Sequence, residues 1–222
     1  MAGQGLKYNV DIVMCIDCTG SMGDLLDTVK NNALKFYPDL RARCEDKGKE
    51  ISELRIRTIT FRDFECEGNA AIADTGFLNI PSEEDDFKKF VSELRPVGGE
   101  EYGNGLEALA MAINSNWTTG GDKRRHVVVV WSNSSTHPLG VGKSNPIYPP
   151  KMPTDFEELT DWWEDNKFGN MSMSTKRLVI FAPNTSAWTE IGMNWINTIH
   201  YPSKAGVGIK DEDYETILSI FF

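Results

Sequence analysis

Positive charge is scarce in this chain of 222 residues. Lys and Arg total 23 against 33 Asp and Glu, so the formal net charge is −10. Non-specific binding to a nucleic acid needs a positive surface that displaces the counterions of the phosphates, and binding to an anionic membrane needs basic clusters. We therefore expect neither a nucleic acid nor a membrane as a partner. The acidic balance instead favours a bound cation or a basic partner.

Long apolar runs and cysteines are also few. No segment approaches the roughly 20 apolar residues of a membrane helix, and the first ten residues, MAGQGLKYNV, hold no apolar signal segment. The four cysteines, Cys15, Cys18, Cys44 and Cys66, fit neither a zinc site nor a disulfide framework. Because Cys15 lies inside an apolar run, the Cys15–Cys18 pair is interpreted as core thiols in a reducing compartment. We expect a cytoplasmic protein.

Repeats, low-complexity segments and a Ser- or Gly-rich linker are missing too. The hydrophobic share of 40% and the charged share of 25% are those of an ordinary globular protein. This composition excludes a disordered chain, a collagen-like chain and a coiled coil. The length allows one large domain or two small ones. Since no linker separates two halves, we predict a single domain over residues 1–222.

Strand-like and helix-like segments alternate along the chain. Apolar runs such as 12–16 and 126–131 are typical of strands that are covered on both faces, as in a parallel sheet. The predicted strands are Asn9–Asp17, Leu54–Phe61, Thr75–Ile80, His126–Trp131, Lys176–Phe181 and Thr198–Tyr201. The predicted helices are Met22–Cys44, a helix to Leu94 with Ser82 as its N-cap, Gly105–Asn114, Asp155–Asn166, Ser186–Trp195 and Asp211–Phe221. This alternation predicts a doubly wound α/β fold, with a mostly parallel central sheet and helices on both faces.

Polar side chains follow several of the predicted strands. Ligands of doubly wound sheets bind beyond the carboxyl ends of the strands, so the residues that matter are 17–21, 62–63 and 132–135. We take Thr75–Ile80 as a short antiparallel strand at one edge of the sheet. The next helix then runs from the opposite edge of the sheet back toward the carboxyl ends of the parallel strands. The loop 98–104 after it therefore brings Glu100 and Glu101 to the carboxyl edge. For Arg62 and Asp63 we expect an ion pair that fixes their loop.

Asp17, Thr19 and Ser21 form a D-x-T-x-S motif directly after the first strand. A carboxylate and two hydroxyls on one tight turn are hard oxygen ligands, which suit Mg²⁺. Gly20 gives the turn the freedom to present both hydroxyls on one side.

This run, DIVMCIDCTGSMGDLL, resembles the first strand, metal loop and first helix of von Willebrand factor A domains. GGEEYGNGLEALAMAI is similar to the second metal loop and its helix, and HVVVVWSNSSTHPLG to the fourth strand and third metal loop. ITFRDF resembles the second-strand ending of many bacterial members, so the chain is most similar to compact single-domain forms. The resemblance implies a Rossmann-like fold and a metal-ion-dependent adhesion site. It also implies a bound Mg²⁺ (or Mn²⁺ or Ca²⁺), a protein partner that supplies an acidic side chain, and no catalytic activity.

The predicted metal ligands depart from the family pattern at two positions. The family usually has a Thr in the second loop, where Glu101 stands here, with Glu100 as the alternative. The third loop usually carries an Asp, and this chain has Asn133. One carboxylate is lost and one gained, so the charge around the site is roughly conserved. The predicted ligand set is Asp17, Thr19, Ser21, Glu101 and Asn133. The competing interpretation is a degenerate scaffold that no longer binds metal.

Other functions remain open from the sequence. DCTGS resembles the D-x-T-G-T phosphorylation loop of cation-pumping ATPases, in which the Asp is the nucleophile, so a phosphoryl-transfer or hydrolytic enzyme using Asp17 is an alternative. Against it, no second acidic motif of the D-x-x-x-D type follows, and no G-x-S-x-G motif comes after a strand. Neither Gly pair is followed by Lys-Ser or Lys-Thr in Walker spacing, which weakens a phosphate-binding loop.

Overall fold

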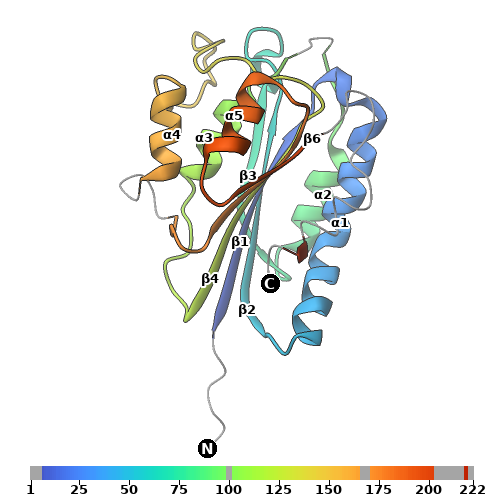
Figure 1. Ribbon diagram of the computed structural model, residues 1–222. Helices are drawn as coiled ribbons and strands as arrows, with labels where there is room; N and C mark the ends of the chain where they lie inside the picture. The colour runs from blue at the N-terminus through green and yellow to red at the C-terminus, as the bar shows by residue number, and fades with distance from the viewer. Residues whose placement is uncertain (1–6, 99–101, 166–170, 203–217, 220–222) are drawn as a thin grey trace, which may run out of the picture.

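The computed structural model describes residues 7–98, 102–165, 171–202 and 218–219. The described strands form one sheet in the order β3-β2-β1-β4-β5-β6 (Figure 1). They are β1 (Tyr8–Asp17), β2 (Ile51–Phe61), β3 (Ile72–Ile80), β4 (Lys123–Trp131), β5 (Lys176–Ala182) and β6 (Thr198–Pro202). All neighbouring pairs are parallel except β2 and β3, which are antiparallel. The predicted mostly parallel sheet with one antiparallel edge strand is confirmed.

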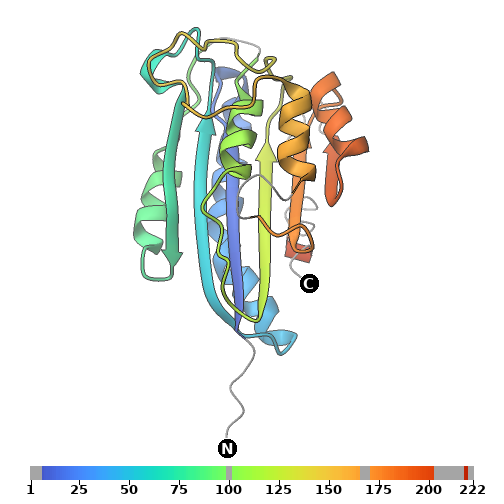
Figure 2. The ribbon, with the colours of Figure 1, turned by 90° about the vertical axis from the view of Figure 1, so that its left-hand side faces the viewer.

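Helices cover both faces of this sheet, as predicted. α1 (Gly23–Asp46) and α2 (Glu84–Glu93) lie on one face, and α3 (Gly105–Ile113), α4 (Phe156–Glu164) and α5 (Ser186–Asn194) lie on the other (Figures 1 and 2). Two short 3₁₀ turns, η1 (Gly20–Met22) and η2 (Gly68–Ala70), follow the carboxyl ends of β1 and β2. The sheet is therefore the middle layer of three.

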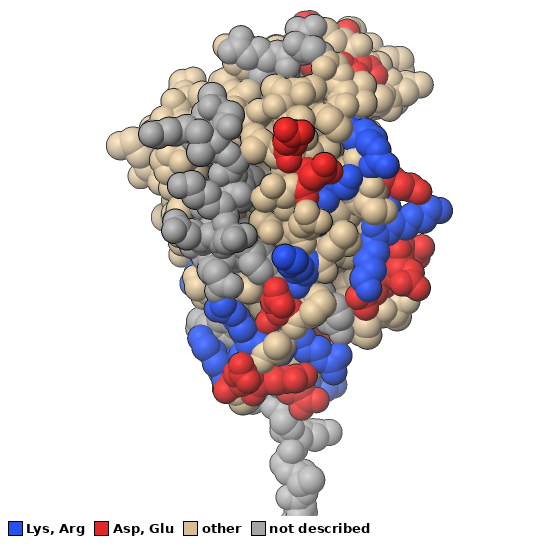
Figure 3. Space-filling view, turned by 90° about the vertical axis from the view of Figure 1, so that its right-hand side faces the viewer, with Lys and Arg blue, Asp and Glu red and all other residues tan. Residues whose placement is uncertain are grey.

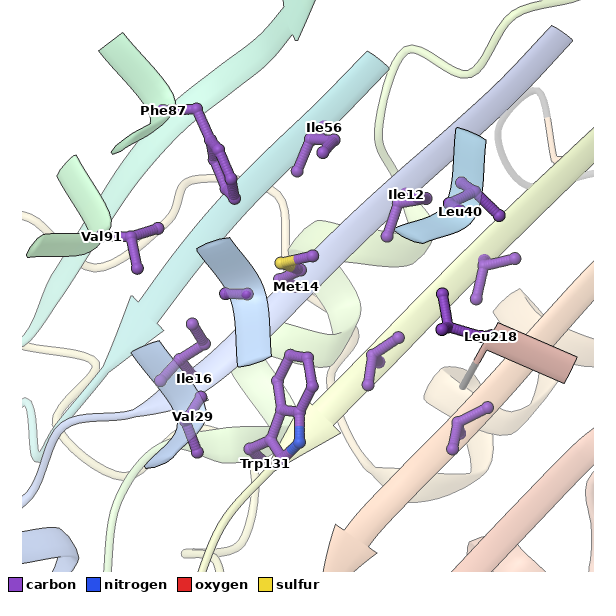
Figure 4. Packing of buried hydrophobic residues seen from close by; sticks show 14 of the residues in the cluster. Ile12, Met14, Ile16, Val29, Leu40, Ile56, Phe87, Val91, Trp131 and Leu218 are labelled. Carbon is purple, nitrogen blue, oxygen red and sulfur yellow. The ribbon is translucent and has the colours of Figure 1, made fainter. Parts of the chain in front are cut away.

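Strand β1 explains why its sequence reads as a nearly continuous apolar run. All ten of its residues are buried. Ile12, Met14 and Ile16 pack against α1 and α2 (Figure 4), whereas Val13 and Cys15 belong to the core on the opposite face, with α3, α4 and α5. Because successive side chains of a strand point to opposite faces, a strand covered on both sides favours apolar residues on both, as at 12–16. The buried polar residues of β1 have partners, such as Arg55 for Asp11 and Ser132 for Asp17.

The cysteines agree with the interpretation as core thiols. Cys15, Cys18 and Cys44 are buried, Cys66 is exposed, and none forms a disulfide within the described residues. Burial raises the pKa of Cys15 and of Cys18 to about 12, so both thiols stay protonated and unreactive at neutral pH. Among the described residues, no helix has the length and apolar character needed to cross a membrane.

Several predicted details differ from the structure or fall outside it. β2, β3 and β4 each begin three residues earlier than predicted, at Ile51, Ile72 and Lys123. The prediction of Ser82 as the N-cap of α2 is wrong. Glu83 is the N-cap, and its carboxylate folds back on Asn79, accepting from the backbone N–H at 2.7 Å and from the side-chain amide at 2.8 Å. The predicted helix Asp211–Phe221 lies outside the described residues except at 218–219, which are helical.

Candidate functional site

The carboxyl edge of the sheet brings the loops after β1 and β4 together. β1 ends at Asp17, and its penultimate residue, Ile16, pairs with Trp131 at the end of β4. The next residues along these parallel strands, Asp17 and Ser132, therefore lie side by side. The Ser132 hydroxyl donates a hydrogen bond of 2.7 Å to Oδ2 of Asp17.

A continuous set of oxygen atoms extends from Asp17 toward the surface. Oδ1 of Asp17 accepts from the backbone N–H of Thr19 at 2.9 Å and from the Thr19 hydroxyl at 2.7 Å. The Thr19 hydroxyl lies 3.0 Å from that of Ser21, which donates to Oδ1 of Asn133 at 2.9 Å. The Asn133 amide donates back to the Ser21 carbonyl at 2.7 Å. We call Asp17, Thr19, Ser21, Ser132 and Asn133 the carboxyl-edge cluster.

Burial decreases outward through this cluster. Asp17 is fully buried and Thr19 nearly so, Asn133 is half-buried, and Ser21 is exposed. Burial raises the pKa of Asp17, while the hydrogen bonds from Ser132 and Thr19 and the charge of Arg62 act in the opposite direction. The carboxylate thus forms the floor of the cluster, and a ligand would approach from the side of Ser21 and Asn133.

Arg62 joins three loops at this edge of the sheet. It donates to the carbonyls of Cys18 at 3.0 Å, Ala70 at 2.6 Å and Arg95 at 3.0 Å. Asp63 accepts from the backbone N–H of Glu65 at 2.7 Å and lies 3.3 Å from Nε2 of His137. Arg62 and Asp63 therefore do fix loops, but through these other partners and not through the predicted ion pair with each other.

The loop between α2 and α3 reaches the carboxyl edge, as its predicted direction requires. The N–H of Val97 donates to the Cys18 carbonyl at 3.0 Å, and the N–H of Asn104 donates to the Arg62 carbonyl at 2.8 Å. Glu100 and Glu101 stand between these two anchored points in sequence but lie outside the described residues. Their role as ligands stays a prediction.

Two buried polar residues of this edge were not assigned a role from the sequence. Ser132 holds Asp17, and the register of β1 and β4 is the signal that places them together. Asn104 is fully buried and joins two loops, because its side chain accepts from Phe64 N–H at 2.8 Å and donates to the Val141 carbonyl at 3.1 Å. Nothing in the sequence around Asn104 distinguishes it from an ordinary helix N-cap.

The spacing of the oxygen atoms fits a hard divalent cation. Adjacent oxygen ligands of an octahedral Mg²⁺ lie about 3.0 Å apart, since the metal–oxygen distance is about 2.1 Å. The Thr19–Ser21 hydroxyl distance of 3.0 Å and the Ser21–Asn133 distance of 2.9 Å have this length, which is also that of the hydrogen bonds that join these groups. The described residues contain no group of three or more His, Cys, Asp or Glu side chains placed to hold a metal. The donor set there is consequently one carboxylate with hydroxyl and amide oxygens.

No protein-family model and no curated protein matches this sequence. Solved structures match it over nearly its whole length. The vWF domain of the type V pili tip protein Mfa5 from Porphyromonas gingivalis is 12% identical, with a TM-score of 0.51, over 98% of this chain and 96% of that one. The pilus adhesin SpaC from Lactobacillus rhamnosus GG is 10% identical with a TM-score of 0.57, over 97% of this chain. A mutant of the PilB minor pilin from Streptococcus sanguinis is 11% identical with a TM-score of 0.56, over all of this chain.

The chain spans only part of two of these proteins, namely 30% of the SpaC chain and 62% of the PilB chain. At identities this low the likeness concerns the fold alone. The strand order, the antiparallel β3 and the helices on both faces agree with it. The described part of this chain therefore has the α/β fold of a von Willebrand factor A-like domain. The carboxyl-edge cluster lies beyond the carboxyl ends of its strands, where doubly wound sheets in general bind ligands.

Proposed function

We propose that this protein is a metal-dependent protein-interaction module. Its carboxyl-edge cluster would hold Mg²⁺ or Mn²⁺, with Ca²⁺ as a further option, and a partner would bind through an acidic side chain. The observation that carries the proposal is the connected row of oxygens from buried Asp17 to exposed Ser21, spaced like neighbouring ligands of one cation.

Each residue of the cluster has a definite part in this proposal. Asp17 contributes the negative charge, Thr19 and Ser21 contribute hydroxyl oxygens, and Asn133 contributes an amide oxygen. Ser132 holds Oδ2 of Asp17 and so positions the carboxylate. When bound, the cation supplies a positive charge that attracts a partner's carboxylate to the exposed side of the cluster. Glu101 would add the charge that Asn133, standing in place of the family's Asp, does not provide.

The burial of Asp17 disfavours its direct attack on a bulky substrate, whereas a small cation beside the Thr19 and Ser21 hydroxyls is still attracted by its charge. The Asp17 side chain is fully buried, and both carboxylate oxygens accept hydrogen bonds from Thr19 or Ser132. The neighbours in fold are a pilus adhesin, a pilus tip protein and a minor pilin, and their names favour an interaction role. We also keep the cytoplasmic location as a proposal, which rests on the buried, unpaired thiols of Cys15, Cys18 and Cys44.

Calorimetric titration with Mn²⁺ tests the proposal. The natural protein should bind one Mn²⁺ saturably, and Asp17→Ala should abolish this binding while the circular dichroism spectrum stays unchanged. Glu65→Gln is the matched control, because Glu65 is an exposed carboxylate at the same edge that lies outside the cluster, and it should bind as the natural protein does. A natural protein that gives no saturable heat would instead establish the degenerate, metal-free scaffold.

A second titration tests the predicted acidic partner, with the same protein variants and a short peptide that contains a single Asp. Binding of this peptide should require Mn²⁺ and should disappear in Asp17→Ala. A peptide in which Asn replaces Asp is the control and should not bind. Equal binding of both peptides, or binding that persists with a chelator, would contradict recognition of an acidic side chain by a bound cation.

A further inference from the structure

A hollow lies at the end of the sheet opposite the carboxyl-edge cluster, where the parallel strands begin. Its volume is about 780 Å³, within the usual range of small-molecule sites. Its walls come from the starts of β1 and β4, the turn between α1 and β2, and the residues just before β5. We call it the amino-edge pocket, and the lining residues used below are Tyr8, Lys49, Lys123, Arg124, Arg125 and Thr175.

The amino-edge pocket is rich in positive charge although the whole chain is acidic. Lys49, Lys123, Arg124 and Arg125 line it, against two acidic residues. Of these two, Asp122 already accepts a hydrogen bond of 2.8 Å from the backbone N–H of Lys7. Figure 3 shows Lys and Arg side chains near the lower end of the molecule, interspersed with Asp and Glu side chains. An anion that the rest of this protein repels finds a favourable potential here.

Arginines crowd this end of the sheet. Arg125 donates a hydrogen bond to the hydroxyl of Tyr8 on the neighbouring strand β1. Arg177 of β5 pairs with Val127 of β4, two residues along from Arg125. Burial and the charge of Arg125 both lower the pKa of Arg177. Like charges packed this closely destabilise one another, and a bound anion would relieve that repulsion.

The pocket wall also contains buried donors without acceptors. Nε of Arg125 and the hydroxyl of Thr175 are buried and have no hydrogen-bond partner among the described residues. A buried donor left unpaired is unfavourable and is uncommon in folded proteins. Both residues line the amino-edge pocket, so a ligand bound there is placed to supply the missing acceptors.

We propose that the amino-edge pocket binds a small phosphate-bearing molecule. A guanidinium presents two parallel donors to a phosphate, lysines add point charges, and hydroxyls donate to the remaining oxygens. The pocket has all three kinds of group, and its 780 Å³ leaves room for more than one phosphate or for an organic part. It is separate from the carboxyl-edge cluster, because Tyr8 and Asp17 stand at opposite ends of β1, about 30 Å apart at 3.3 Å per residue.

Calorimetric titration with pyrophosphate tests this inference. The natural protein should bind pyrophosphate saturably, and a rise from low to physiological salt should weaken the binding. Lys123→Gln, at an exposed position where folding is not at risk, should weaken it about tenfold, the usual effect of losing one charge-assisted bond. Arg125→Lys keeps the charge but loses the paired donors, so it should weaken binding by a similar factor. Lys151→Gln, in the loop before α4, removes an equal charge elsewhere and should have no effect.

Three results would overturn the inference. They are the absence of saturable pyrophosphate binding by the natural protein, equal weakening by Lys151→Gln and Lys123→Gln, and binding of a hexaglutamate peptide as tightly as pyrophosphate. The last of these would identify a site for acidic peptides. Asp17→Ala should bind pyrophosphate normally, so failure of this inference and failure of the proposed metal site are distinguishable.

Discussion

Replacing Arg62 by methionine is expected to lower the free energy of unfolding by about 2 kcal/mol. Arg62 makes three hydrogen bonds to carbonyls of three different loops. A hydrogen bond from a charged donor contributes about 1.5 kcal/mol net at the lower end of its range. The bond to Cys18 is partly buried and should count in full, whereas those to Ala70 and Arg95 are exposed, so water replaces part of their value. Arg62→Lys can restore one of the three and should lose about 1 kcal/mol.

Urea unfolding followed by tryptophan fluorescence measures this loss, with an unchanged m-value as evidence that only stability has changed. Arg95→Met is the matched control. Arg95 is an exposed arginine whose side chain donates to the carbonyls of Ser92 and Leu94, within its own chain segment. This variant should remain within about 0.5 kcal/mol of the natural protein. A loss below about 0.5 kcal/mol for Arg62→Met, or equal losses for both variants, would refute the idea that Arg62 holds the loops together.

Three further outcomes are expected. His126 is buried, its Nδ1 accepts from Ser172 N–H, and burial lowers the pKa of its imidazole. The free energy of unfolding should therefore fall as the pH drops below about 6.5, and it should fall more steeply than in His126→Gln. Burial lowers the pKa of Lys176 to about 8. The free energy of unfolding should therefore rise by on the order of 3 kcal/mol between pH 8 and about 10.5, and this rise should be absent in Lys176→Met. Mn²⁺ affinity, measured by calorimetry, should fall in Glu101→Thr, rise in Asn133→Asp and stay similar in the double variant, because a hard cation follows ligand charge. Stronger binding by Glu101→Thr alone would instead mean that Glu101 covers the site.

The central strands were predictable because burial from two sides favours a continuous run of apolar residues. Residues 12–16 and 127–131 are the examples, and both lie inside central strands. The start of β3 at Ile72 was not predictable, because an edge strand with half-exposed residues carries little hydrophobic signal. Gly76, with a φ of 65°, lies where the pairing of β3 with β2 shifts register.

The candidate site also contains residues that a local motif predicts and residues that only the folded sheet brings in. Asp17, Thr19 and Ser21 form one local motif, so the sequence predicts that they lie together, and the structure brings Asn133 to them. Ser132 gained its role only through the pairing of Ile16 with Trp131, which depends on which strands are neighbours. Strand order is a property of the folded chain and not of any single segment. Hydrogen-bond partners on neighbouring strands, such as Asp17 and Ser132, therefore cannot be identified from local motifs alone.

The position of β1 has a mechanical consequence. This strand is held by parallel neighbours on both sides, with nine or more paired residues along each. A force applied along β1 from its amino-terminal side loads these backbone hydrogen bonds together in shear, whereas β6, a five-residue edge strand with a single neighbour in the described sheet, can be peeled away bond by bond. Under tension the sheet therefore yields from β6 inward, and Asp17, at the far end of β1, keeps its place until the strands around it have separated.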